Sequence, residues 1–334
     1  MRGWLEMDKT TVERLREHHD SLVQRGKIGR LVDAAHGNIP VLYSRGSNLP
    51  EAWENSLVNL WVNGCDIRTQ YDEKDKAGQF VNPPSKDCTM VMVVETPLAE
   101  PYIHRCFPGG LEDLEEYRQE VMDGIKDHWV RDPKDPEDKR WEYTYHERMT
   151  KYRVPGLPGS IDQLELMASA IAKEPITRRA QMISWKPWED NTVEDPACWQ
   201  SYWGRLSRDE KGIACLNIDM RFRSRDAYKA AFMNDFAFIL LGKRLAERIS
   251  KIRGEEVRLA RFIDHSDSYH IYGSYFAEFE STFVRQLLGR SFEERTWRSD
   301  DEMVRETFEE AKGIIAEKVR QEDAKQAGRK AGKP

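Results

Sequence analysis

The feature that most constrains the fold is a predicted strand and helix between residues 213 and 238. Apolar Leu216, Ile218, Met220 and Phe222 alternate with polar residues along the first half of this stretch. Such alternation predicts a strand with one buried face. The second half is dense in alanine and phenylalanine and predicts a long helix. The chain therefore needs a sheet that can pack a helix against one of its faces.

Residues that can bind an anion stand between this strand and this helix. Arg223, Ser224 and Arg225 come immediately before Asp226, which we expect to be the N-cap of the helix. A guanidinium, a hydroxyl and a helix N-terminus in one place can bind a phosphate monoester. Asn234 offers the donor and acceptor that one edge of a nucleobase requires. Taken alone, these residues fit an ordinary buried strand and core helix better than a binding site.

Length and composition indicate one large domain. The chain has 334 residues and 39% hydrophobic content, enough for a sizeable core. We expect a single domain over residues 1–325, with an N-terminal helical elaboration at 1–64 and a C-terminal helix at 298–325. These helices are predicted from amphipathic stretches and capping residues. The remaining residues, 326–334, are predicted to form a disordered tail.

Charge and cysteine content exclude several classes of protein. A formal net charge of -6 disfavours a protein that coats nucleic acid or binds a membrane surface. No apolar run approaches the roughly 18 residues that span a bilayer. The five cysteines are scattered without CxxC spacing, which favours a reducing compartment over disulfides or a structural zinc site. We therefore expect a cytoplasmic protein without metal, nucleic-acid partner or membrane.

Other residues with useful chemistry flank the central strand. Cys198 could act as a nucleophile only as a thiolate, which requires nearby positive charge. Arg178 and Arg179 open a further predicted strand, where neighbouring side chains point to opposite faces. Both could therefore grip one phosphate only from a loop or across a subunit boundary. His270 and Tyr272 lie on one side of an extended segment and could bind a sugar hydroxyl. Each of these residues also has an ordinary structural interpretation.

The order of these motifs resembles that of the thymidylate synthase superfamily. The chain contains R-R, W, P-A-C-W, R-S-x-D, an asparagine eight residues after the aspartate, and H-I-Y. The resemblance covers residues 178–272 well and the N-terminal half loosely. It implies an α/β (α+β) fold with a central mixed sheet flanked by helices, and a homodimer formed through the sheet.

The resemblance implies catalytic roles for several residues. Cys198, introduced by Pro196, would be the nucleophile, and Asp226 would face a folate. The segment Y-T-Y-H-E-R resembles the Y-G-x-x-x-R segment of the family, whose tyrosine assists proton removal. Its spacing assigns this role to Tyr143, but a threonine replaces the glycine, so Tyr145 remains the alternative.

The resemblance also implies a set of substrate-binding residues: Arg68, Arg178, Arg179, Arg223, Ser224, Asn234, His270 and Tyr272. The arginines and serine would hold the phosphate, with the adjacent pair reaching across the homodimer interface. The histidine and second tyrosine would hold the ribose hydroxyl. Asn234 would bind the base and favours uracil over cytosine. A one-residue shift would put Asp235 in that place, and cytosine-specific relatives use an aspartate there.

The implied reaction is methylation of a pyrimidine nucleoside monophosphate at C5, dUMP to dTMP, with 5,10-methylenetetrahydrofolate. A Cys198 thiolate would add to C6 and activate C5. The alternative is a hydroxymethylase that acts on dUMP, dCMP or CMP. Three departures indicate a divergent member: Phe222 replaces the usual glutamine, the short apolar C-terminus is absent, and the glutamate acting at O4 is not identifiable. A third possibility, a non-catalytic nucleotide-binding relative, is disfavoured by the retained cysteine.

Overall fold

The computed structural model of the protein describes residues 7–131, 138 and 140–331, with side chains through Lys325. The described chain forms a nine-stranded mixed sheet in the order β1-β2-β4-β10-β8-β7-β6, with β3 beside β4 and β9 beside β10. The strands are Ile28–Val32 (β1), Val41–Gly46 (β2), Cys65–Ile67 (β3), Ser85–Val94 (β4), Gln181–Ile183 (β6), Trp199–Arg208 (β7), Ala214–Phe222 (β8), Arg225–Asp226 (β9) and Val257–Ile271 (β10). A small second sheet pairs β5 (Ile103–His104) with β11 (Thr296–Trp297).

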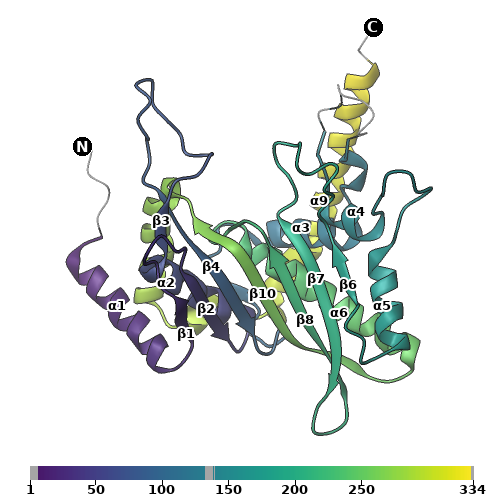
Figure 1. Cartoon of the computed structure of the whole chain (residues 1–334), viewed down its shortest axis with the longest axis horizontal. Coiled ribbons are helices and arrows are strands. Elements are labelled where there is room, and N and C mark those ends of the chain that lie inside the picture. The colour runs from purple at the N-terminus through teal and green to yellow at the C-terminus, as the bar shows by residue number, and fades with distance from the viewer. Residues whose placement is uncertain (1–6, 132–137, 139, 332–334) are drawn as a thin grey trace.

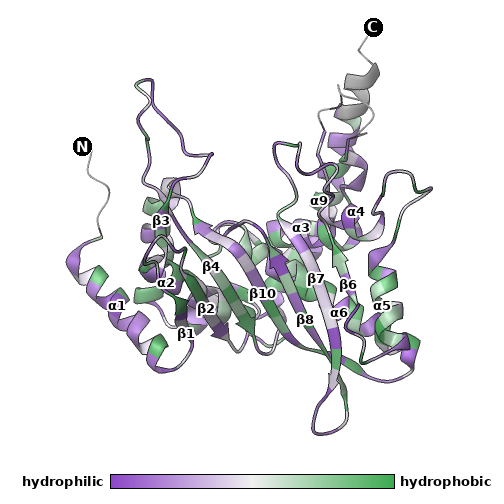
Figure 2. Cartoon of the chain, in the orientation of Figure 1, coloured by the Kyte–Doolittle hydropathy of each residue, from purple (hydrophilic) through white to green (hydrophobic). Residues whose placement is uncertain are grey.

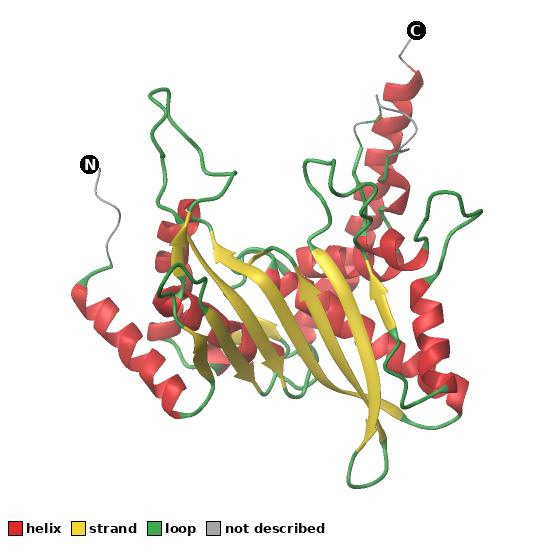
Figure 3. Cartoon of the chain, in the orientation of Figure 1, coloured by secondary structure: helices red, strands yellow, loops and turns green. Residues whose placement is uncertain are grey.

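Helices cover one face of this sheet. The α-helices are Lys9–Gln24 (α1), Leu49–Asn63 (α2), Leu111–Asp123 (α3), Tyr145–Thr150 (α4), Gln163–Lys173 (α5), Ala231–Arg253 (α6), Phe276–Glu278 (α7), Arg285–Gly289 (α8) and Glu302–Ala331 (α9). Short turns are Asp127–Trp129 (η1), Gly273–Tyr275 (η2), the π-helical Phe279–Val284 (η3) and Glu293–Arg295 (η4). Helices α2 and α6 contact each other and both pack on the sheet. In Figures 1 and 3 the opposite face of the sheet is turned toward the viewer, and no described helix crosses it.

The central strand β8 has the two faces that its sequence predicts. Leu216, Ile218, Met220 and Phe222 are all buried, each at 1% exposure or less. Burying one such side chain contributes roughly 1.5–3 kcal/mol to folding. The residues between them are half-buried or exposed on the uncovered face, and Figure 2 shows this mixture of hydrophobic and hydrophilic residues along the strands. The mixed α/β class and the helix-flanked mixed sheet are thus confirmed.

The two ends of the chain depart from the sequence prediction. Residues 1–64 are not only helical, because β1 and β2 join the central sheet and β2 runs parallel to β4. These strands are short, and β1 buries only its first residue, so the alternation that marks a strand is weak. The C-terminal helix begins at Glu302 rather than 298 and continues to Ala331, past the predicted end at 325. Residues 332–334 of the predicted tail lie outside the described part. None of the described helices is long and apolar enough to cross a membrane.

Candidate active site

Cys198 and Arg223 lie side by side because two antiparallel strands bring them together. Cys198 immediately precedes β7, and Arg223 immediately follows its partner β8. The Arg223 amide donates to the Cys198 carbonyl at 2.9 Å. The guanidinium donates to the carbonyls of Ala197 at 3.0 Å and Pro196 at 2.6 Å. Its Nη2 lies 3.7 Å from the Cys198 Sγ. The backbone before the cysteine therefore fixes a positive charge beside the sulfur.

The charge of the Cys198 thiol depends on opposing effects. Burial raises its pKa, the Arg223 guanidinium lowers it, Asp195 raises it, and Arg225 lowers it. The net direction is above the usual thiol value, so the sulfur in this single chain is protonated at neutral pH. A nucleophilic thiolate would require more positive charge than these two arginines supply.

A groove of about 470 Å³ lies beside the cysteine. Its lining residues are Thr69, Gln70, Tyr71, Glu194, Asp195, Cys198, Arg223, Ser224, Ser268, His270 and Tyr272. It thus brings together the predicted nucleophile, the predicted phosphate-binding Arg223 and Ser224, and the predicted sugar-binding pair. The strands explain this convergence, because β8 and β10 are parallel and the residues at their C-terminal ends meet at one edge of the sheet.

The sugar-binding pair is packed within the groove. His270 is 4% exposed, and its Nδ1 lies 3.1 Å from the Ser268 Oγ. The Tyr272 ring stands edge-on to the imidazole, with 4.6 Å between ring centroids. Burial lowers the pKa of His270 to about 4, so this imidazole is neutral at physiological pH.

Asp226 does not cap the long helix as the sequence predicts. Helix α6 begins at Ala231 and its N-cap residue is Ala230. Asp226 instead belongs to β9, and its Oδ1 accepts from the amides of Tyr228 at 3.0 Å and Lys229 at 2.8 Å. The carboxylate thus caps a turn that precedes the helix, which local sequence cannot distinguish from a helix start. Burial raises the Asp226 pKa to about 6.

A second cavity of about 450 Å³ adjoins the groove and shares Asp195 with it. It is lined by Tyr117, Glu120, Arg140, Trp141, Glu142, Tyr143, Thr144, Tyr145 and Asp195. The two tyrosines considered for proton removal pack against each other here with tilted rings, 5.5 Å between centroids. The Tyr145 hydroxyl accepts from the Trp199 amide at 3.3 Å. Burial, then the neighbouring Cys198, raises the Tyr143 pKa. Both tyrosines therefore lie close to the start of β7.

Asn234 and Asp235 occupy different environments. The Asn234 amide donates to the Tyr117 hydroxyl at 2.5 Å, so it lies beside the tyrosine-lined cavity rather than in the groove. Asp235 is fully buried and pairs with Arg225 at 2.6 Å, and a second carboxylate, Asp264, pairs with the same guanidinium at 2.7 Å. Burial raises the Asp235 pKa, which the arginine opposes. Neither Asn234 nor Asp235 lines the groove or the tyrosine-lined cavity, but the Asp235 carboxylate is engaged by Arg225, whereas the Asn234 amide contacts the cavity-lining Tyr117.

Arg68 does not line the groove. Its Nη1 donates to Asp72 at 3.1 Å and to the Asn82 carbonyl at 2.8 Å. Its guanidinium lies over the Phe80 ring, 4.0 Å from the centroid. These contacts hold Arg68 within its own loop, of which only residues 69–71 line the groove.

Arg178 and Arg179 lie in the loop before β6, not at the start of a strand as predicted. Both are exposed, and neither lines the groove of its own chain. The Arg178 carbonyl accepts from the Trp203 indole at 3.1 Å. Trp203 pairs with Asp219 of β8, whose side chain lies on the uncovered face of the sheet. The two arginines therefore stand at the edge of that uncovered face.

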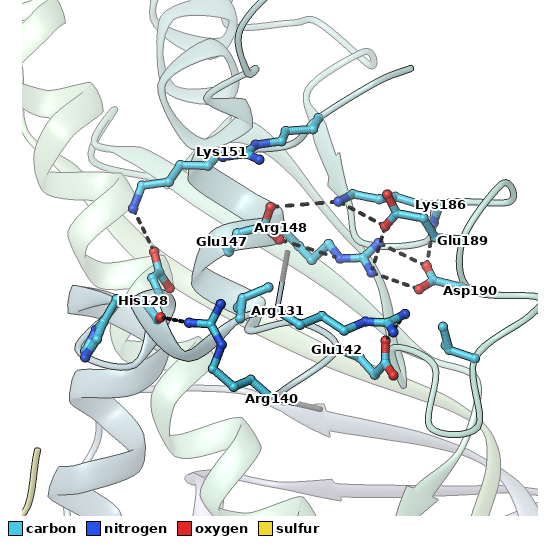
Figure 4. Close-up of a pocket in the computed structure, with 15 residues that line it drawn as sticks. His128, Arg131, Arg140, Glu142, Glu147, Arg148, Lys151, Lys186, Glu189 and Asp190 are labelled. Carbon is cyan, nitrogen blue, oxygen red and sulfur yellow. Dashed lines mark hydrogen bonds and ion pairs between the residues drawn. The ribbon is translucent and has the colours of Figure 1, made fainter. Parts of the chain in front are cut away.

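A third cavity, of about 710 Å³, contains none of the predicted site residues and shares Arg140 and Glu142 with the tyrosine-lined cavity (Figure 4). Its lining is strongly charged, but the charges pair with one another. Arg131 pairs with Glu142 at 2.6 Å, and Lys151 pairs with Asp127 at 3.1 Å. Arg148, 2% exposed, pairs with Asp190 at 2.8 Å. We interpret this region as an ion-pair network that fixes the loop ahead of Cys198, because mutual pairing leaves little net charge for a ligand.

The sequence interpretation missed several residues of the two cavities. Ser268 stands two residues before His270, so strand periodicity alone could have placed it on the same face. Tyr117 and Glu120 are three apart on α3, which puts them on one side of that helix. Burial raises the Glu120 pKa. No group of three or more potential metal ligands gathers among the residues that the structure describes.

No family model matches this sequence, but several curated proteins of archaea are similar to it. A protein of Methanopyrus kandleri is 30% identical over 209 residues, which is 62% of this chain and 84% of the relative. A protein of Methanocaldococcus jannaschii is 26% identical over 238 residues, 67% of this chain and 88% of the relative. A Methanosarcina mazei protein is 25% identical over 205 residues, 61% of this chain and 80% of the relative. Each of the three is named "Putative thymidylate synthase".

The similarity to these relatives extends across most of their length, and three of the motifs that carry the resemblance, P-A-C-W, R-S-x-D and H-I-Y, meet around one cysteine at one edge of the sheet. On these grounds the chain belongs to the thymidylate synthase family.

Proposed function

We propose that this protein methylates a pyrimidine nucleoside monophosphate at C5, converting dUMP to dTMP with 5,10-methylenetetrahydrofolate. The observation that carries the proposal is the position of Arg223, whose Nη2 lies 3.7 Å from the Cys198 Sγ in a groove that also contains Ser224 and His270. One guanidinium can there serve both a thiolate and a phosphate. Binding energy from the phosphate then orients the distant base over the sulfur.

The chemistry of the chain's own residues follows from this arrangement. Addition of the Cys198 thiolate to C6 moves an electron pair toward C5 and O4 and makes C5 nucleophilic. Tyr143 stays protonated because burial raises its pKa, and its hydroxyl orients the water that carries the C5 proton away to solvent. Release of the sulfur from C6 at the end restores the thiol. Asn234 holds the uracil edge, and Glu120 is our candidate for the carboxyl that acts at O4.

The tyrosine-lined cavity supports a planar one-carbon donor. It has about 450 Å³, aromatic walls and a half-buried carboxyl, and it adjoins the groove at Asp195. Bound there, 5,10-methylenetetrahydrofolate would supply the one-carbon unit and, for methylation, the hydride. Asp226 lines neither this cavity nor the groove, so its role toward the donor rests on the resemblance alone.

The uncovered sheet face supports a homodimer with shared sites. Side chains such as Trp203, Asp219 and Ile263 are only half-buried on this face in the single chain. Arg178 and Arg179 stand at its edge and would reach the partner's groove. Their charge would lower the pKa of the partner's Cys198, which burial raises in the single chain.

The position of α9 favours one alternative, hydroxymethylation of dUMP, dCMP or CMP. Lys318 pairs with Glu116 of α3 at 3.1 Å, and Asp323 accepts from the Trp129 indole at 2.8 Å. These contacts hold the charged C-terminal helix against α3 and η1. Methylation requires water to be kept from the methylene intermediate, whereas hydroxymethylation requires water as the reactant.

Product analysis tests both reactions. The protein is incubated with 5,10-methylenetetrahydrofolate and dUMP, dCMP or CMP. The absorbance of dihydrofolate together with a methylated nucleotide supports methylation. A product about 16 mass units heavier, formed with tetrahydrofolate, supports hydroxymethylation. Absence of any modified nucleotide from all three substrates would overturn the proposed function.

A further inference from the structure

A chain of three polar side chains leads from the back of the groove to His270. Asp87 of β4 lies opposite His270 of β10 in the antiparallel ladder. Ser268 stands two residues before the histidine, and its Oγ connects the two. The Ser268 Oγ donates to the Asp87 Oδ2 at 2.7 Å and lies 3.1 Å from the His270 Nδ1. Asp87 is 6% exposed and lines neither cavity, whereas Ser268 and His270 line the groove.

The donor and acceptor groups of these three side chains fix the direction of the hydrogen bonds between them. An ionised carboxylate can only accept hydrogen bonds, so the Ser268 hydroxyl gives its one proton to Asp87. The serine oxygen can then only accept from the imidazole, which places the proton of neutral His270 on Nδ1. The other nitrogen, Nε2, has no hydrogen-bond partner within the described part of the chain. It is left as an acceptor that requires a donor from elsewhere.

The charge states agree with this direction. Burial raises the Asp87 pKa to about 6, which leaves the carboxyl ionised at neutral pH. Burial lowers the His270 pKa to about 4, which leaves the imidazole uncharged. The hydrogen bonds from His270 through Ser268 to Asp87 require a neutral imidazole at one end and an ionised carboxylate at the other.

We propose that Asp87 and Ser268 are positioning residues that hold His270 in its Nδ1–H tautomer, so that Nε2 accepts a hydrogen bond from a sugar hydroxyl of the nucleotide. The identity of the ligand rests on the proposed function, but the tautomer does not. The site therefore selects nucleoside monophosphates whose sugar carries a free hydroxyl, and Asp87 acts without touching the ligand.

The tautomer is measured in the full chain without any ligand. Proton–nitrogen correlation spectra of protein containing isotopically labelled histidine distinguish the two ring nitrogens at neutral pH. Loss of one signal set in His270→Gln assigns the residue. We expect the proton on Nδ1 in the wild type and a shift toward Nε2–H in Ser268→Ala and Asp87→Asn. A proton on Nε2 in the wild type, or an unchanged tautomer in Ser268→Ala, would overturn the proposal.

Ser266→Ala is the matched control. Ser266 lies on the same strand, and its hydroxyl also donates to a buried carboxylate, Asp264, at 3.4 Å. It does not contact His270, so this variant should retain the Nδ1 proton. A shifted tautomer in Ser266→Ala would show that general loosening of β10 moves the proton, and would count against a specific role of Ser268.

The second readout compares the binding of dUMP with that of 2′,3′-dideoxyuridine monophosphate, which lacks the sugar hydroxyl. The wild type should bind dUMP about tenfold more tightly, the size of one hydrogen bond to a neutral acceptor, and Ser268→Ala should lose most of this preference. Equal preferences in the two proteins would overturn the positioning role. If the tautomer result holds but no nucleotide is modified in the product assay, the proposed function fails and the positioning of His270 stands.

Discussion

The reactivity of Cys198 is set by groups that come from separate parts of the chain. The guanidinium of Arg223 approaches from the end of β8, and the carboxylate of Asp195 comes from the preceding loop. Burial outweighs the arginine, so the thiol pKa lies above its usual value. The residue becomes a nucleophile only when its surroundings gain positive charge.

The variant Cys198→Ala tests covalent catalysis. We expect turnover to be lost while nucleotide affinity changes by less than about tenfold, because the phosphate and sugar contacts do not involve the sulfur. Product formation and binding of dUMP are measured on the same preparation. Cys215→Ala is the control, since Cys215 is a buried cysteine of β8 outside both cavities and its removal should leave turnover intact. Appreciable turnover by Cys198→Ala would contradict the mechanism.

Asp226 predicts a pH dependence of stability. Its pKa is raised from 3.8 to about 6, so the folded state binds more protons than the unfolded state between these values. Stability due to this group is therefore highest below pH 3.8 and falls as pH rises to about 6, by roughly 3 kcal/mol at most. Urea unfolding across this range should show the wild type losing stability relative to Asp226→Asn. Parallel pH profiles of the two proteins would exclude this contribution.

At the scale of elements, a buried arginine secures the loop ahead of the cysteine. The Arg148 guanidinium, on α4, donates to the Ser184 carbonyl at 2.9 Å and to both carboxylate oxygens of Asp190, at 2.8 Å and 3.1 Å. The same carboxylate accepts from the Lys186 amide at 2.6 Å. One ion pair therefore connects α4 with both ends of the turn that leads to Cys198.

Removing one partner of the Arg148–Asp190 ion pair should destabilise the folded protein. Arg148→Met leaves Asp190 buried without its counter-charge, and we expect a loss of about 3–5 kcal/mol in the free energy of unfolding. The double variant Arg148→Met with Asp190→Leu removes the uncompensated charge and should recover part of this loss. Urea denaturation of the three proteins measures the effect. If the double variant were less stable than the single one, the buried charge would not be the cause.

The close contact of Gly273 with Pro83 predicts that a side chain at this position would impair nucleotide binding. Gly273 follows Tyr272, and a Cβ atom built on it would lie 2.0 Å from the Pro83 carbonyl oxygen. Gly273→Ala must therefore push apart the end of β10 and the loop that carries residues 69–71 of the groove. We expect KM for the nucleotide to rise at least about tenfold with a smaller change in kcat. Gly289→Ala, where nothing lies within 4 Å of the new Cβ, is the control. Equal kinetics in the two variants would contradict this prediction.

At the scale of the whole molecule, the uncovered sheet face and the two exposed arginines predict a shared active site. Mixed Arg179→Ala and Cys198→Ala subunits should regain activity, because each heterodimer then contains one site with an intact cysteine and an intact arginine from the partner. Random mixing should restore about a quarter of wild-type activity. Activity is measured after mass analysis has verified the heterodimers. Verified heterodimers without activity would mean that the arginines serve their own chain or none.

Local sequence predicts part of this architecture and chemistry. The buried face of β8 follows from alternation over a few residues, and it appears where the pattern places it. The start of α6 does not follow from the local sequence, because Asp226 caps a turn with the same hydrogen bonds that an N-cap would make. β1 was missed because this edge strand buries only its first residue, and β2 was missed because two of its three buried residues, Ser44 and Gly46, are not hydrophobic.

The sequence by itself determined which kinds of residue this protein has available and in what order: a cysteine after a proline, arginines around it, and a histidine and tyrosine on one strand. Short-range periodicity and motif spacing contain that information. Only the tertiary structure decided which of these residues meet. The parallel pairing of β8 with β10 brings Arg223 to His270, the ladder with β4 brings Asp87 behind them, and the ion pair with Arg225 withdraws Asp235. Both strand pairings depend on register across long sequence separations, which no local pattern encodes.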